Sequence, residues 1–182
     1  MVMSTQTAPG ELERVRDFVN TLDVESGADS LSSPETLRAW LQGRDLSPGR
    51  SATRADLVAA RRIREAIRAL LLENNGLSVR KEAALTLNRA AARAGVSLRF
   101  DSGGRVRLEP AARGVDAALG RLVAIAASAM VDGTWARLKA CRADDCHWAF
   151  YDRARNHSRH WCSMAVCGNR TKARTYRQRH AG

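Results

Sequence analysis

All four cysteines of this 182-residue chain lie between Cys141 and Cys167, and the first 140 residues contain none. They form two pairs with the same spacing, Cys141-x4-Cys146 and Cys162-x4-Cys167, and fifteen residues separate the pairs. Each pair can give two thiolates to one metal ion, and the intervening segment is long enough to bring the pairs together. The spacing therefore predicts one structural zinc ion bound by four cysteines.

Two histidines lie close to these cysteines in the sequence. His147 and His160 could compete as zinc ligands. Four thiolates already fill a tetrahedral shell, however, and such a site keeps no open position for a catalytic water molecule. We therefore expect both imidazoles to pack or to form hydrogen bonds.

The N-terminal sequence has no basic segment followed by an apolar stretch, so a secretory signal is not expected. No apolar run approaches the about 20 residues that cross a bilayer, and we expect no membrane partner. These features predict a cytoplasmic protein, in which the reducing environment favours metal-bound thiols over disulfides. If the protein binds DNA, it would be associated with the nucleoid.

Positive charge is concentrated near the C-terminal end. The formal net charge of the chain is +11. Between Lys139 and Gly182, ten Lys and Arg residues against three Asp give +7, which leaves +4 for the first 138 residues. Such a local excess predicts an anionic partner, although a charged run can also be a solvated face.

Apolar residues before Cys141 recur mostly at helical spacing and predict a mainly α domain over residues 1–138. One stretch alternates instead, VSLRF and RVRLEP around DSGG, and predicts a single β-hairpin. Sequence signals for helix caps support the helices, among them Ser33-Pro34, Thr53 with Asp56, and the segment ENNG. The expected helices cover about residues 11–24, 34–42, 53–73, 78–93 and 115–138.

The helical domain carries no recognisable catalytic constellation. It lacks a Gly-rich phosphate loop, a convincing carboxylate pair and a cysteine nucleophile, and all four histidines follow position 146. Asp17, Asn20, Thr21 and Asp23 could line a polar pocket, but we interpret them as surface and capping residues. The domain is expected to bind or regulate, and the chain is not expected to be an enzyme.

The fifteen residues between the cysteine pairs, HWAFYDRARNHSRHW, are rich in aromatic side chains. Trp148 and Phe150 are expected on one face of a short strand, followed by a polar turn near RNHS and by Trp161 on the return. A segment this small buries little area, so the metal and the aromatic residues must share its stabilisation.

The segment after the last cysteine predicts a basic helix. Gly168 is expected to let the backbone turn tightly around the metal, and Asn169 to cap a helix over RTKARTYRQR. With a first cysteine knuckle, a hairpin and a helix that begins at the second cysteine pair, residues 139–182 predict a treble-clef-like zinc finger. Helical spacing places the basic residues on two faces of this helix. One face has Arg170, Arg174 and Arg177, and the other has Lys172 and Arg179 with Tyr176 between them.

The same segment resembles the CGNR zinc finger, a bacterial C-terminal module named for its Cys-Gly-Asn-Arg sequence. The resemblance runs from Cys141 to Arg179 and includes the run WCSM and the central residues Phe150, Asp152 and Arg155. Upstream, RDFVNTLD and LSSPETLRAWL resemble the start of the ABATE domain, which usually precedes this finger. That family is regarded as stress-induced transcription regulators, with the finger as the DNA-binding part.

The resemblance implies zinc binding by the four cysteines and makes a transcription regulator that contacts duplex DNA the leading hypothesis. RNA or ribosome binding, with Trp148, Trp161 and Tyr176 stacked on bases, is one alternative. A redox switch that loses zinc on thiolate oxidation is another. A homodimer through the helix AALGRLVAIAASAM and a small-molecule effector are further hypotheses. The residues expected to contact nucleic acid are Arg153, Arg155, Arg159, Arg170, Lys172, Arg174, Arg177 and Arg179.

Overall fold

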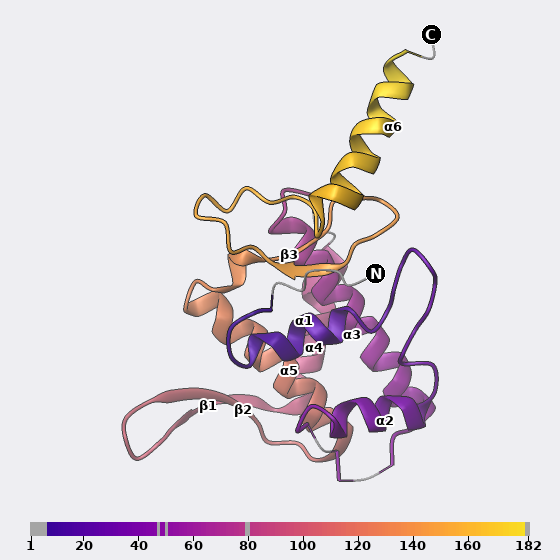
Figure 1. The fold of residues 1–182 in the computed structure, drawn as a ribbon. Helices are drawn as coiled ribbons and strands as arrows, with labels where there is room; N and C mark the ends of the chain where they lie inside the picture. Colours follow the sequence, from indigo (N-terminus) through magenta and orange to yellow (C-terminus); the bar gives the residue numbers. More distant parts are fainter. Residues whose placement is uncertain (1–6, 47, 50, 79–80, 181–182) are drawn as a thin grey trace.

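The computed structural model describes residues 7–46, 48–49, 51–78 and 81–180. It is mainly α, as expected, with a helical body and a short C-terminal module from which the last helix projects (Figure 1). The helices of the described residues are α1 (Leu12–Val19), α2 (Pro34–Gln42), α3 (Arg54–Glu73), α4 (Lys81–Ala94), α5 (Gly114–Val131) and α6 (Asn169–Arg179). The strands form two antiparallel pairs, β1 (Val96–Phe100) with β2 (Val106–Pro110) and β3 (Leu138–Ala140) with β4 (Ala149–Tyr151).

Helix α5 forms the centre of the helical domain. It packs against α1, α4 and β2, and its buried residues include Val115, Leu122 and Ile125. By length and composition alone α5 could cross a membrane. Most of its apolar side chains line the core shared with Phe18 and Leu71.

The predicted N-caps of α2 and α3 are both present, and each forms a capping box. The Ser33 hydroxyl accepts a hydrogen bond from the Thr36 amide, and the Thr36 hydroxyl accepts one from the Ser33 amide. Thr53 and Asp56 form the equivalent pair at the start of α3. Helix α4 begins at Lys81, and residues 79 and 80 of its expected start lie outside the described residues.

The predicted hairpin is confirmed, with Leu98 opposite Leu108 and Phe100 opposite Val106. Its tip extends to one side of the helical body (Figure 1). The side chain of Phe100 is 73% exposed there, so the alternating apolar pattern marks a strand without marking a buried face.

Helix α5 ends seven residues earlier than the expected boundary at residue 138, so that part of the prediction is wrong. Asp132 accepts a hydrogen bond from the Thr134 amide at 2.9 Å, and Gly133 has a φ of +81°, a left-handed conformation that ends a helix. Trp135 and Leu138 continue the apolar pattern, but they enter the core from a 3₁₀ turn and from β3. The boundary expected at residue 138 falls inside β3.

We predict that Gly120→Ala destabilises the helical domain by about 1–3 kcal/mol, because the end of α4 packs directly against α5 there. A Cβ at position 120 would lie 2.3 Å from the Cβ of Ala94. Urea unfolding followed by circular dichroism measures the change. The control is Gly43→Ala, where the nearest atom is the carbonyl oxygen of Ala39 at 3.5 Å, and equal stabilities of the two variants would contradict the prediction.

Candidate metal centre and its attachment

The four cysteine sulfur atoms meet at one point between β3 and α6. All four thiols are free and buried, and their Sγ atoms lie within 4.8 Å of one another. Two of the separations are 3.6 Å, between Cys146 and Cys162, and 3.7 Å, between Cys162 and Cys167. Sulfur ligands at about 2.3 Å from a tetrahedral zinc ion lie about 3.8 Å apart, so the donor set fits one structural zinc ion.

The electrostatics of the cluster favour a cation. Hydrogen bonds from the thiols of Cys146 and Cys162 lower the pKa of Cys141 to about 2. The same pairing with Cys141 raises the pKa of Cys146 to about 12, and burial raises the pKa of Cys167. One thiolate therefore forms readily, but the remaining thiols resist ionisation because the new charges would lie beside it. A dication removes this conflict, since it stabilises all four thiolates.

The backbone at the last ligand differs from the expected tight turn. Gly168 has helical angles, φ −63° and ψ −49°, at the end of a single π-helical turn, η2 (Met164–Gly168). A Cβ at Gly168 would lie 2.5 Å from the Met164 sulfur, so this glycine permits a close side-chain contact. Asn169 does not cap α6 but is its first residue, and its side-chain amide donates to the Ala165 carbonyl. Ser163 caps the preceding turn η2, where its hydroxyl accepts from the Val166 amide.

A buried ion pair holds the loop between the cysteine pairs. Lys139 Nζ lies 2.9 Å from Asp152 Oδ2, and it also donates to the carbonyls of His157 and Arg159. Asp152 accepts from the amides of Ala154 and Arg159. Burial alone would raise the pKa of Asp152, but these hydrogen bonds, with that of Lys139 the strongest, lower it.

This loop contains no returning strand, which corrects the expected hairpin between the cysteine pairs. Strand β4 pairs instead with β3, which precedes the first cysteine. Phe150 is buried beside the four cysteines, and Trp148 and Trp161 pack partly buried against the same cluster. The aromatic residues therefore pack against the four cysteines, as expected. The loop between Phe150 and Trp161 is held by the Lys139–Asp152 ion pair.

Asn75, directly after α3, joins the finger to the helical domain. Its amide group donates at 2.8 Å to the carbonyls of Ala140 and His160, and its Oδ1 lies 2.8 Å from His160 Nδ1. Burial, reinforced by the positive charges of Arg142 and Lys139, lowers the pKa of His160 and favours the neutral imidazole. The sequence predicted only helix-end chemistry for this asparagine.

Three more side chains of the helical domain bind the finger through its main chain. Asn20 donates to the Ala149 carbonyl at 2.9 Å and accepts from the Ala149 amide at 2.7 Å. Arg68 donates to the carbonyl of His147, and Asn74 donates to that of Leu138. Asn20 thus takes part in a domain junction, a role that nothing in its local sequence indicates.

Two of the eight basic residues expected to contact nucleic acid are held by carboxylates. Arg170 forms ion pairs with Glu25 and with Asp145, and Arg174 Nη2 lies 3.2 Å from Asp145 Oδ2. A second carboxylate, on Asp144, lies 3.4 Å from Arg174 Nη1. These acids lie in the first cysteine knuckle and in the helical domain, so they anchor the base of α6.

Other members of the set are less constrained. Arg153 donates to the Thr7 carbonyl, and Arg159 donates to the Cys162 carbonyl and lies over the Phe150 ring. The remaining four are exposed, and within the described part of the chain no carboxylate forms an ion pair with them. They are Arg155, Lys172, Arg177 and Arg179.

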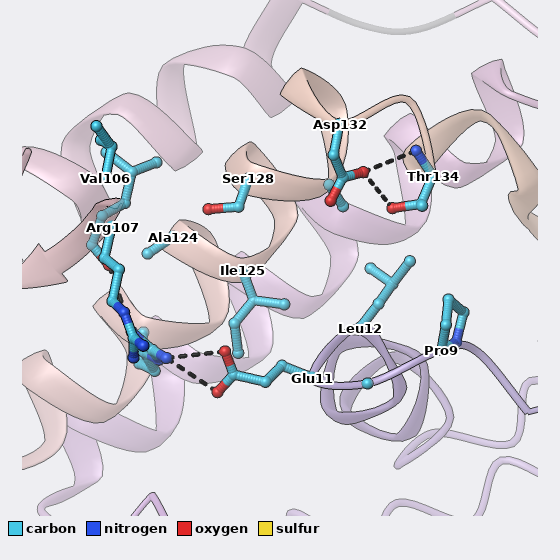
Figure 2. Close-up of a pocket in the computed structure, with 14 residues that line it drawn as sticks. Pro9, Glu11, Leu12, Val106, Arg107, Ala124, Ile125, Ser128, Asp132 and Thr134 are labelled. Atoms are coloured by element: carbon cyan, nitrogen blue, oxygen red, sulfur yellow. Dashed lines mark hydrogen bonds and ion pairs between the residues drawn. The ribbon is translucent and has the colours of Figure 1, made fainter. Parts of the chain in front are cut away.

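The helical domain also contains a hollow of about 480 Å³ between α1, β2 and α5 (Figure 2). Its two acidic side chains already have partners. Glu11 binds Arg121 with both carboxylate oxygens, and Asp132 accepts from Thr134. The carboxylates that line the hollow are therefore paired.

We predict one zinc ion per chain, bound by four thiolates. Removal of the metal with a strong chelator, or Cys162→Ser, should unfold the residues after position 140, because the finger has little apolar core of its own. Helices α1 to α5 should remain folded. Elemental analysis and amide hydrogen exchange measure both effects. Ser158→Ala, at an exposed position of the same finger, should keep its zinc, and freshly purified protein without zinc would contradict the prediction.

We also predict that Asn75→Ala destabilises the protein by about 3 kcal/mol, since two buried carbonyls and the His160 imidazole lose their partner. Faster amide exchange in the finger should accompany the loss. The matched control is Asn88→Ala, at an exposed position of α4. Equal unfolding free energies for the two variants would show that the junction does not depend on Asn75.

Two family models match this chain. Residues 137–180 match the CGNR zinc finger, and residues 13–133 match the ABATE family, described as "Putative stress-induced transcription regulator". No curated protein matches the sequence. The ABATE match covers about two thirds of the chain, and the finger match contains the four cysteines of the metal centre. The chain therefore belongs to the ABATE family and carries a CGNR zinc finger after the ABATE domain.

Proposed function

We propose that this protein is a DNA-binding transcription regulator whose finger contacts duplex DNA through α6. The observation that carries the proposal is the nature of this helix. It has five Lys and Arg residues, no acidic residue and no buried residue, and it projects from the rest of the molecule (Figure 1). A helix with so few apolar residues cannot form part of a hydrophobic core, so its surface is available for an anionic partner.

The dimensions of α6 suit the major groove. Its 11 residues span about 16 Å, and the groove of B-DNA, about 12 Å wide, admits an α-helix. Lys172, Arg177 and Arg179 extend from the helix, and Arg155 extends from the loop before the second cysteine pair. We assign phosphate and base contacts first to these four residues, whereas Arg170 and Arg174 orient the helix through their carboxylate partners.

We propose a regulatory rather than enzymatic role for the helical domain. The paired charges of the hollow between α1 and α5 support this role, since a catalytic acid or base must be free to exchange a proton. The domain also positions the finger through Asn20, Arg68 and Asn75, so that α6 points away from the body.

The test is the salt dependence of DNA binding. We predict that Lys172→Gln, Arg177→Gln and Arg179→Gln, combined, reduce the slope of log K against log salt by about three units, because each lost phosphate contact releases about one counterion fewer. Fluorescence anisotropy with duplex DNA at several salt concentrations measures the slope. The control is Arg38→Gln, which removes the charge of an exposed arginine of α2, away from the finger. An unchanged slope in the triple variant would remove the main support for α6 as the contact surface.

A second candidate, binding to single-stranded RNA, rests on a groove beside α6. Trp161, Lys172 and Tyr176 line this groove of about 400 Å³, and Tyr176 stacks on His180 at 4.1 Å. The buried Trp161 Nε1 has no acceptor among the described residues. Such aromatic surfaces can stack on unpaired bases. Stronger competition by single-stranded RNA than by duplex DNA would favour this candidate.

The redox alternative depends on oxidant reaching the sulfur atoms. Their burial disfavours rapid oxidation, because susceptibility follows the exposure of the thiolate. Zinc release measured during a peroxide titration tests this alternative separately from nucleic-acid binding.

A further inference from the structure

A cavity of about 630 Å³ lies between α3 and α4, on the helical domain. Its walls are two stripes of side chains at helical spacing. On α3 the spacing is i, i+4 and i+8, and on α4 it is i, i+3 and i+7. The stripes consist of Arg54, Val58 and Arg62 on α3, and of Thr86, Arg89 and Arg93 on α4.

The floor of the cavity is apolar. Ile63 and Leu119 are 5% and 3% exposed and belong to the main core. Above them, Val58 presents a side chain that is 43% exposed, and Ala59 and Ala90 add further apolar surface. An exposed valine between two core residues and two arginines is an apolar surface that a bound molecule can cover.

The rim of the cavity is positive. Arg54, Arg62 and Arg89 are exposed, and the structure gives them no acidic partner among the residues it describes. Among the described residues that line the cavity, Asp116 is the one acidic residue, and its Oδ1 lies 2.8 Å from Arg93 Nε. Three guanidinium groups thus remain to bind an anion.

We propose that this cavity binds a small amphipathic organic anion, with an apolar body on the floor and a carboxylate or phosphate group at the rim. Its volume lies within the about 300–1,000 Å³ of small-molecule sites. Guanidinium groups recognise both acid groups through paired hydrogen bonds. An inorganic anion would leave the apolar floor uncovered, and a neutral apolar molecule would leave the arginines without a partner.

The site is separate from the finger. The cavity lies on the N-terminal half of α3, while the asparagines that bind the finger follow the other end of the same helix. The proposal therefore holds whether or not α6 binds DNA.

Calorimetric titration of the zinc-loaded full-length protein tests the proposal. Decanoate and decyl phosphate are the probes, and they show which acid group the rim prefers. Decanol, acetate and inorganic phosphate are the controls, and each should bind at least about tenfold more weakly than the probes, since each lacks one half of the recognised chemistry. Equal binding of decanol and decanoate would overturn the proposal, and so would the failure of both probes at millimolar concentration.

Three variants locate the site. Arg62→Gln and Arg89→Gln should each weaken decanoate about tenfold or more, because each removes a charge-assisted hydrogen bond. Val58→Asp should abolish binding by placing a carboxylate on the floor. All three positions are exposed, so the fold should persist, which circular dichroism verifies. Arg99→Gln, an exposed arginine of the β1–β2 hairpin, should leave the affinity unchanged, and a rim variant that binds like the parent would place the ligand elsewhere.

Discussion

Four buried sulfur atoms within 4.8 Å of one another are the constraint on which the finger depends. Four thiolates this close repel one another, and a dication turns the repulsion into attraction. The apolar material around them is small, since each strand of the β3–β4 pair has three residues and α6 buries none. The metal centre therefore replaces a core and fixes the start of α6, where Cys167 lies in the π-helical turn.

The finger is attached to the helical domain by apolar contact and by directed hydrogen bonds. Leu138, Ala140, Ala149 and Tyr151 belong to the main core. The amides of Asn20 and Asn75 and the guanidinium of Arg68 reach main-chain groups of the finger, and so satisfy carbonyls of β4, β3 and the first cysteine knuckle. Because hydrogen bonds depend on direction, they also set the orientation of β3 and β4 and, through the cysteines, that of α6. A fixed orientation of α6 matters because we propose that this helix enters the major groove of DNA.

The basic residues discussed above fall into three groups. At the base of α6, Arg170 and Arg174 bind carboxylates and so contribute to structure. On the same helix, Lys172, Arg177 and Arg179 keep exposed charges that we assign to nucleic acid. Arginines that line the cavity between α3 and α4 form a third group, for which we propose a small anion. Net charge alone could not separate these groups, since every member adds the same +1.

The sequence by itself determined the zinc ligands, the β1–β2 hairpin and the N-caps of α2 and α3, because each follows from residues a few positions apart or from one repeated spacing. Tertiary structure decided the rest. Asn75 and Ala140 are 65 positions apart, and Asn20 and Ala149 are 129 apart, so no local pattern relates them. Trp135 and Leu138 continue a helical pattern, yet they reach the core from other elements because Gly133 ends the helix first. Burial and pairing depend on which distant segments meet, and only the folded chain brings those segments together.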